Sequence, residues 1–406
     1  MIVFYRLSIL FYGLTLKIAA IFNKKAALWI SGRKNFFEKL PDVSNKKVQW
    51  FHCASLGEFE QARPLIESWK EKYSDDFILI TFFSPSGYEI QKEYAKADYV
   101  CYLPLDTNYN AKRFIQHFNP ENVFFVKYEF WLNFIDAAHK NNTNIFSIST
   151  LLRPNQRFFK WYGGIFRKRL HYFTHFFVQN EETAQLLSSI NVTTHTITGD
   201  TRFDRVYKRS LNHTENEIIS HWLGTGKAFV IGSSWPLEES FLIPFINSYE
   251  GKVIVAPHEV NEKHIKQIES KLTTVYQKYT TINKVINPEA KVLILDCIGV
   301  LADAYKYGEI AYVGGAFGSG LHNILEPAAF GLPVIFGPKH KKFPEAQLFI
   351  DQKVGFSIDS SEQFINTFEK IQNNLSPIQK KLKNLMQSNV GATEKIMQKL
   401  KPKNQV

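Results

Sequence analysis

Carboxylates stand at two places where an apolar run gives way to a helix-like segment. Glu58 follows the run 48–53 in the stretch FHCASLGEFEQ, and Glu129 follows the run 122–127. In open α/β sheets, ligands bind beside the carboxyl ends of the strands, so both acids are expected to face one site. An acid in this position can cap a helix by facing the positive end of its dipole. It can equally act as a base toward a substrate hydroxyl.

A glycine-rich stretch in the second half of the chain, YVGGAFGSGLHNILEPAAFGLPVIFGP (312–338), suits an anion. Its glycines, Gly315 and Gly318 among them, let backbone N–H groups approach a phosphate, and a helix is predicted to begin near 323–326. The stretch lacks the Gly-Lys-Ser/Thr of a Walker A loop and does not follow the first strand, as a dinucleotide fingerprint does. A nucleotide phosphate site in a second domain fits better. Glu326 is then either a ligand of a ribose diol or only a helix N-terminal acid.

Composition and charge narrow the class of protein. The 406 residues are 45% hydrophobic and 21% charged, which indicates folded domains and is long enough for two. The formal charge is +11, and residues 1–47 hold nine Lys or Arg against two acids, while residues 151–175 hold six against none. Such patches suit an anionic membrane surface, an anionic lipid or nucleic acid, or are an ordinary solvated face. The three cysteines are far apart, which favours reduced thiols and no zinc site.

The N-terminus carries an apolar segment that the sequence alone does not assign to one environment. Within residues 1–22, the charge-free run 7–16 is about half the ~20 residues that a membrane span needs. Lys17 follows directly, without a clear cleavage site, which argues against a secretory signal. The alternatives are a short span with Arg6 and Lys17 reaching the interface, a helix lying in the interface, and an amphipathic helix of a soluble protein. The basic run behind the segment places the rest of the chain on the cytoplasmic side.

Short apolar runs alternate with helix-like segments after residue 47, which predicts an α/β fold of doubly wound parallel sheets. Strands are expected at 48–53, 77–82, 99–103, 122–127, 144–149, 175–179 and 194–198, and again at 228–234, 252–257, 291–296, 310–315, 333–336 and 355–358. The polar break at 204–224 is interpreted as a linker with a short helix. Two Rossmann-like domains then face a cleft.

The expected domain boundaries follow from these runs. They are a membrane anchor or interfacial helix at 1–25, a Rossmann-like domain at 26–205, a linker at 206–224, a second Rossmann-like domain at 225–375 and a basic helical segment at 376–406. The last segment is a candidate for packing back on the first domain.

Several stretches together resemble the family of 3-deoxy-D-manno-octulosonic acid (Kdo) transferases, glycosyltransferases of lipopolysaccharide biosynthesis that act on a lipid A precursor. They are HxxSxGE from His52 to Glu58, YLPLD at 102–106, Glu129-Phe130-Trp131, TGDTRFD at 198–204 and the glycine-rich stretch. The resemblance covers about 48–360 and the basic apolar N-terminus. The set is specific, although no single piece is.

The resemblance implies a GT-B-like fold in which the domain 26–205 binds the acceptor and the domain 225–375 binds the nucleotide-sugar donor. It implies an inverting transfer of Kdo from CMP-Kdo to a hydroxyl of a lipid A precursor (lipid IVA), without metal or other cofactor. It implies that Glu58 is the general base and that Glu129 stands beside it. Donor binding is expected at Ser233, Ser234, His258, Gly315, Gly318, His322, Asn323 and Glu326. Contacts with the acceptor or lipid phosphate are expected at Ser55, Arg153, Arg157, Arg167 and Lys168. The expected location is the cytoplasmic face of the inner membrane, with its anionic lipid surface as a partner and no nucleic acid.

Two departures from the family pattern concern the donor phosphate. An Arg is expected beside the histidine after the strand 252–257, but APHEV leaves His258 without it. Trp235 stands where a histidine is expected after the strand 228–234. The missing charge is available from Lys339, His340, Lys341 and Lys342. The alternatives to this transferase are a nucleotide-sugar epimerase of the same fold, a glycosyltransferase with another nucleotide-sugar donor, and a non-enzymatic module that binds RNA or membranes.

Overall fold

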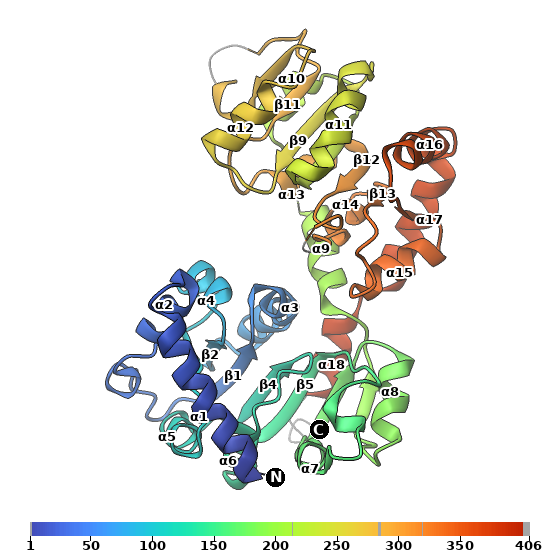
Figure 1. The fold of residues 1–406 in the computed structure, drawn as a ribbon. Helices are drawn as coiled ribbons and strands as arrows, with labels where there is room; N and C mark the ends of the chain where they lie inside the picture. Colours follow the sequence, from blue (N-terminus) through green and yellow to red (C-terminus); the bar gives the residue numbers. More distant parts are fainter. Residues whose placement is uncertain (1, 213, 283–285, 319, 401–406) are drawn as a thin grey trace. The chain divides into compact units, whose positions relative to one another are not determined.

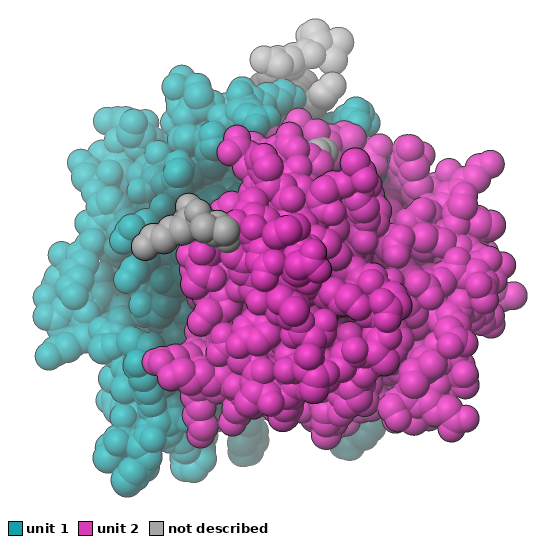
Figure 2. Space-filling view, turned by 90° about the horizontal axis from the view of Figure 1, so that it is seen from above, with its two compact units in different colours: residues 1–205, 389–406 teal, residues 206–388 magenta. Residues whose placement is uncertain are grey.

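Two parallel seven-stranded sheets organise the computed structural model of the chain, which describes residues 2–212, 214–282, 286–318 and 320–400 (Figure 1). Each sheet belongs to its own unit. Unit 1 comprises residues 1–205 and 389–406, and unit 2 comprises residues 206–388; Figure 2 colours them separately. The α/β class predicted from the alternating runs is confirmed.

The sheet of unit 1 has the strand order β3-β2-β1-β4-β5-β6-β7, with every pair parallel. Its strands are β1 (Val48–Cys53), β2 (Phe77–Phe82), β3 (Tyr99–Tyr102), β4 (Asn122–Val126), β5 (Asn144–Thr150), β6 (His175–Val178) and β7 (His195–Ile197). The central strands read as unbroken apolar runs because helices cover both faces of a doubly wound sheet. The order reverses between β1 and β4, and at such a switch point the strand ends leave room for a ligand.

Helices cover both faces of this sheet. They are α1 (Ile2–Ala19), α2 (Lys24–Ser31), α3 (Leu56–Lys72), α4 (Pro85–Gln91), α5 (Asn108–Phe118), α6 (Leu132–Lys140), α7 (Gly164–Leu170), α8 (Glu181–Ser188) and α18 (Ala392–Lys399), with short 3₁₀ turns at Phe36–Glu38 and Arg157–Phe159. One core cluster unites the sheet with α5, α6 and α8, and another unites it with α3 and α18. The last described helix therefore belongs to unit 1, while the helix before it belongs to unit 2.

Unit 2 also has a doubly wound parallel sheet, but its order, β10-β11-β9-β8-β12-β13-β14, places the fourth strand of the unit, β11, between β10 and β9. Its strands are β8 (Ala228–Ser234), β9 (Lys252–Pro257), β10 (Tyr276–Lys278), β11 (Val292–Ile294), β12 (Gly308–Val313), β13 (Val334–Phe336) and β14 (Gly355–Ser357). Its helices are α10 (Glu217–Leu223), α11 (Pro236–Ser248), α12 (Glu262–Glu269), α13 (Leu301–Ala304), α14 (Leu325–Ala329), α15 (Pro344–Asp351), α16 (Ser361–Gln372) and α17 (Leu375–Ser388), with 3₁₀ turns at Tyr279–Thr281 and Tyr305–Tyr307. Helix α9 (Thr201–Leu211) contains the boundary between the units.

The structure differs from the sequence-based expectation at the polar break. Residues 206–224 were expected as a linker with a short helix, but residues 206–211 complete α9 and residues 217–223 form α10. Ile219, Trp222 and Leu223 of α10 are buried in the core of unit 2. Of the C-terminal segment 376–406, residues up to 388 lie in unit 2 and only the part from 389 onward lies in unit 1.

Candidate active site

Glu58 lies in the first turn of α3, directly after β1, and its carboxylate does not serve as a backbone cap. Ser55 occupies the N-cap position without making a side-chain capping bond, and its hydroxyl instead donates to Glu58 Oε2. The other oxygen, Oε1, lies 3.7 Å from Lys127 Nζ. Among the described residues, no backbone N–H donates to this carboxylate. Glu58 is therefore held by side chains that leave it in a polar, partly exposed position.

Lys127 directly follows β4, and its side chain reaches Glu58. Its backbone has φ of 60°, in the left-handed region that few residues other than glycine adopt. Two bonds to β5 hold this turn: the Lys127 N–H donates to Ile148 O at 3.0 Å, and Ser147 Oγ donates to Lys127 O at 3.3 Å. The strand end thus aims an ammonium group at the carboxylate of the neighbouring strand end.

Glu129 joins this pair two residues further along the chain. Burial raises the pKa of the Glu129 carboxyl, the nearby Glu58 raises it further, and Lys127 lowers it. Glu58 and Glu129 therefore interact electrostatically, as two acids that share one site do. The sequence-based expectation that the two acids lie together agrees with this geometry.

A buried histidine fixes the segment that carries Glu129. His52 of β1 is fully buried, and burial lowers its pKa to about 3, so the ring is neutral. Trp131 Nε1 donates to His52 Nε2 at 3.0 Å, which places the ring proton on Nδ1, 2.9 Å from Thr81 Oγ1. The first residue of the HxxSxGE stretch thus orients the 127–131 segment and does not itself face a substrate.

A pocket of about 690 Å³ opens beside Glu129; we call it the Glu129 pocket. Helix α1 forms one wall and the segment 155–166 forms another. Its lining includes Tyr5, Ile9, Tyr12, Tyr128, Glu129, Trp131, Arg157 and Phe166. The pocket combines aromatic walls with an acid and an exposed arginine, which suits an amphiphilic substrate.

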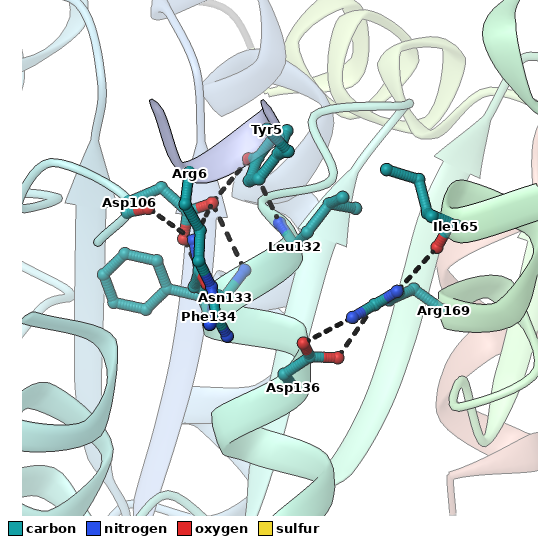
Figure 3. Close-up of polar contacts among 9 residues, drawn as sticks. All are labelled: Tyr5, Arg6, Asp106, Leu132, Asn133, Phe134, Asp136, Ile165 and Arg169. Carbon is teal, nitrogen blue, oxygen red and sulfur yellow. Dashed lines mark hydrogen bonds and ion pairs between the residues drawn. The ribbon is translucent and has the colours of Figure 1, made fainter. Parts of the chain in front are cut away.

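Both walls of the Glu129 pocket are fastened to helix α6 (Figure 3). The carboxylate of Asp106 accepts the backbone N–H groups of Asn133 and Phe134 at 3.2 and 3.1 Å, and the Tyr5 hydroxyl at 2.5 Å. Arg6 Nε donates to Asn133 Oδ1 at 3.2 Å. A single buried carboxylate therefore caps α6 and ties α1 to it.

The opposite wall is tied to the same helix by an ion pair. Arg169 of α7 makes a two-pronged contact with Asp136 of α6, at 2.9 and 2.7 Å, and also donates to Ile165 O (Figure 3). The paired geometry is stronger and more directional than a single contact. The position of α6 therefore sets the width of the Glu129 pocket.

The basic residues expected at the acceptor phosphate differ in exposure and in their contacts. Arg157 is exposed and lines the Glu129 pocket, and Lys168 is exposed on α7. Arg153 lies close enough to Tyr128 to lower the pKa of its hydroxyl against the effect of burial. Arg167 Nη1 instead donates to Phe158 O and Lys160 O, at 3.0 and 2.7 Å, and so stabilises the turn. Ser55 is likewise engaged by Glu58.

In unit 2, an internal carboxylate occupies the glycine-rich loop. Glu238 is fully buried, and it accepts the N–H of Gly315 at 2.7 Å and the N–H of Trp235 at 3.1 Å. Gly318 and Gly320 donate to the carbonyl of Gly315, both at 3.0 Å. The sequence-based idea that these N–H groups cradle a phosphate therefore needs correction for Gly315, Gly318 and Gly320, because the fold already uses them.

Ser234, an expected donor ligand, is buried in a separate polar network. Its hydroxyl donates to Glu239 Oε1 at 2.7 Å, and His264 Nε2 lies 2.9 Å from Glu239 Oε2. All three side chains are buried. This network fixes the end of β8, where Ser233 adopts φ of 54°, and it leaves Ser234 no access to a ligand.

Three rings form a stacked group beside the glycine-rich loop. The His258 ring lies 4.5 Å from the Trp235 ring and 4.3 Å from the His322 ring, and Trp235 Nε1 donates to His322 Nε2 at 3.0 Å. Burial lowers the pKa of both histidines, to about 4 for His322. Trp235, the departure from the family pattern, thus holds the two expected donor histidines together.

Next to the rings, the Asn323 side-chain amide donates to Glu326 Oε1 at 3.1 Å and its carbonyl oxygen accepts Leu325 N–H at 3.1 Å. These bonds orient the Glu326 carboxylate at the start of α14. Lys339 Nζ reaches Gly318 O at 3.1 Å. Within the described part of the chain, no group of three metal-ligating side chains is assembled.

Comparison with known proteins shows which family the chain resembles. Residues 31–205, which carry the Glu58 and Glu129 site, match the family model for 3-deoxy-D-manno-octulosonic-acid transferase (kdotransferase). The chain is 26% identical to the 3-deoxy-D-manno-octulosonic acid transferase of Aquifex aeolicus over 83% of its own length and 90% of that protein. With the enzyme of the same name from Chlamydia muridarum, identity is 27% over 86% of this chain and 84% of the other. The chain is thus similar to the Kdo transferases over most of its length. It is accordingly a glycosyltransferase.

Another relative is larger. The chain is 25% identical to a bifunctional glycosyltransferase/methyltransferase of Fusobacterium nucleatum, and the match spans 84% of this chain but only 55% of that protein. Among solved structures, UDP-GlcNAc 2-epimerase from Neisseria meningitidis matches with a TM-score of 0.61 at 15% identity, covering 87% of this chain and 98% of that one. A glycosyltransferase from Rickettsia africae matches with a TM-score of 0.56 at 12% identity, covering 87% and 97%. These two likenesses concern the fold alone.

Several residues of the site were not singled out by sequence reasoning. Lys127 and Tyr5 carry no motif that would mark them. Asp106 ends the YLPLD stretch, and Trp131 belongs to the Glu129-Phe130-Trp131 stretch, so both stood in segments that the resemblance had marked. Their roles as helix cap and histidine partner became visible only with the fold.

Proposed function

We propose that the chain transfers Kdo from CMP-Kdo to a hydroxyl of a lipid A precursor, with Glu58 as the general base. The observation that carries the proposal is the placement of Glu58 between Ser55 and Lys127, beside the half-buried Glu129 and next to a pocket walled by an apolar helix. The carboxylate is positioned by side chains and does not cap the backbone of α3. Its oxygens can therefore accept a proton from a substrate, as a general base must.

In the proposed reaction, Glu58 takes the proton of the acceptor hydroxyl as its oxygen attacks the anomeric carbon of Kdo. The bond to CMP breaks on the opposite side, so the centre inverts without a covalent sugar–enzyme intermediate. Glu129, whose pKa is raised, keeps a proton to higher pH than an ordinary carboxyl and can donate a hydrogen bond to the acceptor. The two acids then have distinct tasks that follow from their surroundings.

The Glu129 pocket is the proposed acceptor site, and α1 is the proposed membrane contact. This helix is long and apolar enough to cross a membrane by length and composition. It exposes a continuous set of large apolar side chains, and Trp161 near the second wall is 91% exposed. The exposed large apolar residues of the helix are Val3, Phe4, Leu7, Leu10, Phe11, Tyr12, Leu14 and Ile18. An apolar stripe flanked by basic residues is typical of a helix that lies in the interface.

The polar contacts of α1 favour an in-plane helix over a span. Tyr5 and Arg6 bond to Asp106 and Asn133 of the same unit, so the start of the helix is fixed to a folded domain. A span would carry these polar groups into hydrocarbon, which is costly. We therefore place the chain on the cytoplasmic face of the inner membrane, with anionic lipid as its surface partner and with Arg157 and Lys168 toward the lipid phosphates.

CMP-Kdo is assigned to unit 2, beside the ring group of His258, Trp235 and His322. The carboxylate of Glu326, oriented by Asn323, is the proposed ligand of the ribose hydroxyls. Since the fold uses the Gly315 N–H internally, the charge that develops on the CMP phosphate is assigned to the basic segment 339–342. The proposal includes no metal and no nucleic acid.

The decisive experiment is transfer from freshly generated CMP-Kdo to tetraacyl lipid A precursor in detergent, read by mass spectrometry. Wild type should add one or more Kdo-sized mass increments. Glu58→Gln should lower turnover by about 10²–10⁴ while it retains donor affinity. Glu67→Gln, on the same helix but paired with Arg63, is the matched control and should remain active.

Two outcomes would reject parts of the proposal. An equal loss of donor affinity in Glu58→Gln would remove Glu58 from the role of base. Wild type that isomerises a soluble sugar nucleotide without detergent or acceptor, and adds no Kdo, would favour an epimerase.

A further inference from the structure

A second pocket lies along a different side of α1 from the Glu129 pocket. It encloses about 950 Å³ between α1, α2, the segment 33–38 and the segment 104–113; we call it the α1–α2 pocket. Its walls are mainly apolar and include Leu10, Leu14, Ala27, Ile30, Phe37 and Leu105. Neither Glu58 nor Glu129 lines it. The proposed transfer chemistry therefore leaves this pocket without a task.

Cations line the α1–α2 pocket. Lys17, Lys34 and Arg113 are exposed lining residues, and Glu38 is the single carboxylate among the lining residues. In the described part of the chain, none of these three cations takes part in an ion pair. The Arg113 guanidinium lies 4.1 Å from the centre of the Phe37 ring. Three unpaired positive charges at an apolar cavity complement a ligand with a negative head and a hydrocarbon tail.

A fourth basic residue of the pocket is structural. The Arg33 guanidinium donates to three backbone carbonyls, Trp29 O, Phe83 O and Leu103 O, at 3.0, 2.9 and 2.7 Å. It lies 3.6 Å from the centre of the Trp29 ring. Arg33 thus fixes α2 to the rest of unit 1 and gives the pocket a rigid wall.

The pocket is continuous with the surface that we place in the membrane. Leu10 and Leu14 line the pocket and are also 55% and 54% exposed on the apolar face of α1. One turn further along this side, Lys17 stands at the end of the stripe. An acyl chain can therefore pass from the bilayer into the pocket along apolar side chains, with its head group left near the cations.

We propose that the α1–α2 pocket binds one anionic membrane phospholipid, with an acyl chain between α1 and α2 and the phosphate held by Lys17, Lys34 and Arg113. The lipid is a structural partner and not the sugar acceptor. The inference uses the proposed membrane contact only as the source of the lipid, and it does not depend on Kdo transfer. A bound lipid ties α1 to α2 and makes the active fold sensitive to the charge of the bilayer.

The test uses the full chain and a short lipid that is monomeric in water. Dihexanoylphosphatidylglycerol is titrated by calorimetry, and native mass spectrometry gives the stoichiometry. Dihexanoylphosphatidylcholine is the charge control, and inorganic phosphate is the control for the head group alone. One molecule of the anionic lipid should bind, more tightly than the zwitterionic one.

Variants locate the site. Ala27→Trp fills the pocket and should abolish binding. Lys34→Ala and Arg113→Ala, both at exposed positions that should not disturb folding, should each weaken binding by about fivefold. Leu7→Trp, on the exposed face of α1 outside the pocket, and Lys263→Ala, an exposed cation on α12 of unit 2, should leave binding unchanged. Glu58→Gln should also leave it unchanged, so a failure of the proposed chemistry is separable from a failure of this site.

Three results would overturn the inference. Equal affinity for the two lipids would remove the charge requirement. Undiminished binding in Ala27→Trp together with Lys34→Ala would place the lipid elsewhere. Inorganic phosphate that binds as tightly as the lipid would reduce the site to an anion site without an acyl chain.

Discussion

Lys127 Nζ lies 3.7 Å from Glu58 Oε1, although the Lys127 backbone must adopt a φ of 60° to bring it there. For a residue other than glycine, this conformation costs on the order of 1 kcal/mol. The same cation lowers the pKa of Glu129, which burial and Glu58 raise. Lys127 therefore sets the charge balance between the two acids of the site.

Replacing Lys127 by Met should shift the alkaline limb of the pH–rate profile to higher pH by about 1 unit. The cation lowers the Glu129 pKa, so its removal raises that pKa, and Glu129 keeps the proton that it shares with the acceptor to higher pH. The measurement is kcat/KM between pH 5 and 9. Lys127→Arg is the control and should keep the wild-type limb. An unshifted limb in Lys127→Met would mean that Lys127 acts on neither acid.

Trp131→Phe should lower kcat by about tenfold because it removes the donor to His52 and frees the segment that carries Glu129. It should also lower the free energy of unfolding by about 1–3 kcal/mol, since His52 Nε2 is left buried without a partner. Trp69→Phe removes another buried indole bond, the 2.8 Å contact with Asp76, far from the acids. It should lose stability and keep kcat. An equal loss of kcat in both variants would refute a positioning role for Trp131.

Asp106 should make unit 1 more stable in mild acid. Burial raises its pKa from 3.8 to about 6, so the folded state binds this proton more tightly than the unfolded state. The stabilisation is complete below the ordinary pKa, and it is lost as the pH rises through about 6. Asp106→Asn should remove up to about 3 kcal/mol of this pH dependence.

Urea unfolding between pH 4.5 and 7 would measure the difference between wild type and Asp106→Asn. The exposed Asp75→Asn is the control and should follow wild type. Parallel curves for wild type and Asp106→Asn would show that this carboxyl does not titrate differently on folding.

Glu238→Ala should loosen the glycine-rich loop. Its loss leaves the N–H groups of Gly315 and Trp235 without their acceptor. A stability loss of about 2–4 kcal/mol is expected, since two bonds to a buried carboxylate are removed. Donor affinity, measured by calorimetry with CMP, should fall as well. Leu237→Ala, exposed beside it, should change neither; retained donor affinity in a destabilised Glu238→Ala would separate the loop from the donor site.

Most strands could be predicted because a doubly wound sheet buries both faces of its strands. Strands buried on both faces appear in the sequence as continuous apolar runs. The strand Tyr276–Lys278 was missed because it is a short polar edge strand, YQK, without such a run. Helix α10 was expected only as a short helix of a linker, because its polar segment conceals the three side chains that it buries in unit 2.

The candidate site was predictable where position along a strand decides it. Glu58 and Glu129 each follow the carboxyl end of a strand, and the carboxyl ends of parallel strands lie at the same edge of the sheet. The role of Lys127 was not predictable, because it depends on one backbone angle. Glycine-rich loops can bind a phosphate or an internal carboxylate with the same N–H groups. The sequence therefore could not show that Glu238 accepts the Gly315 N–H. Ser234 looked available at its strand end, yet its side chain turned inward to Glu239.

Helix α18 completes the core of unit 1 although its sequence follows all of unit 2. Ile396 is fully buried in the cluster that contains Ile66 and Phe177. On a ribosome that adds about 5–20 residues per second, the apolar surface that receives Ile396 waits about 10–40 s while the intervening unit is made. The nascent first unit therefore presents an open apolar surface to chaperones during that interval, and its folding ends with the arrival of the last helix.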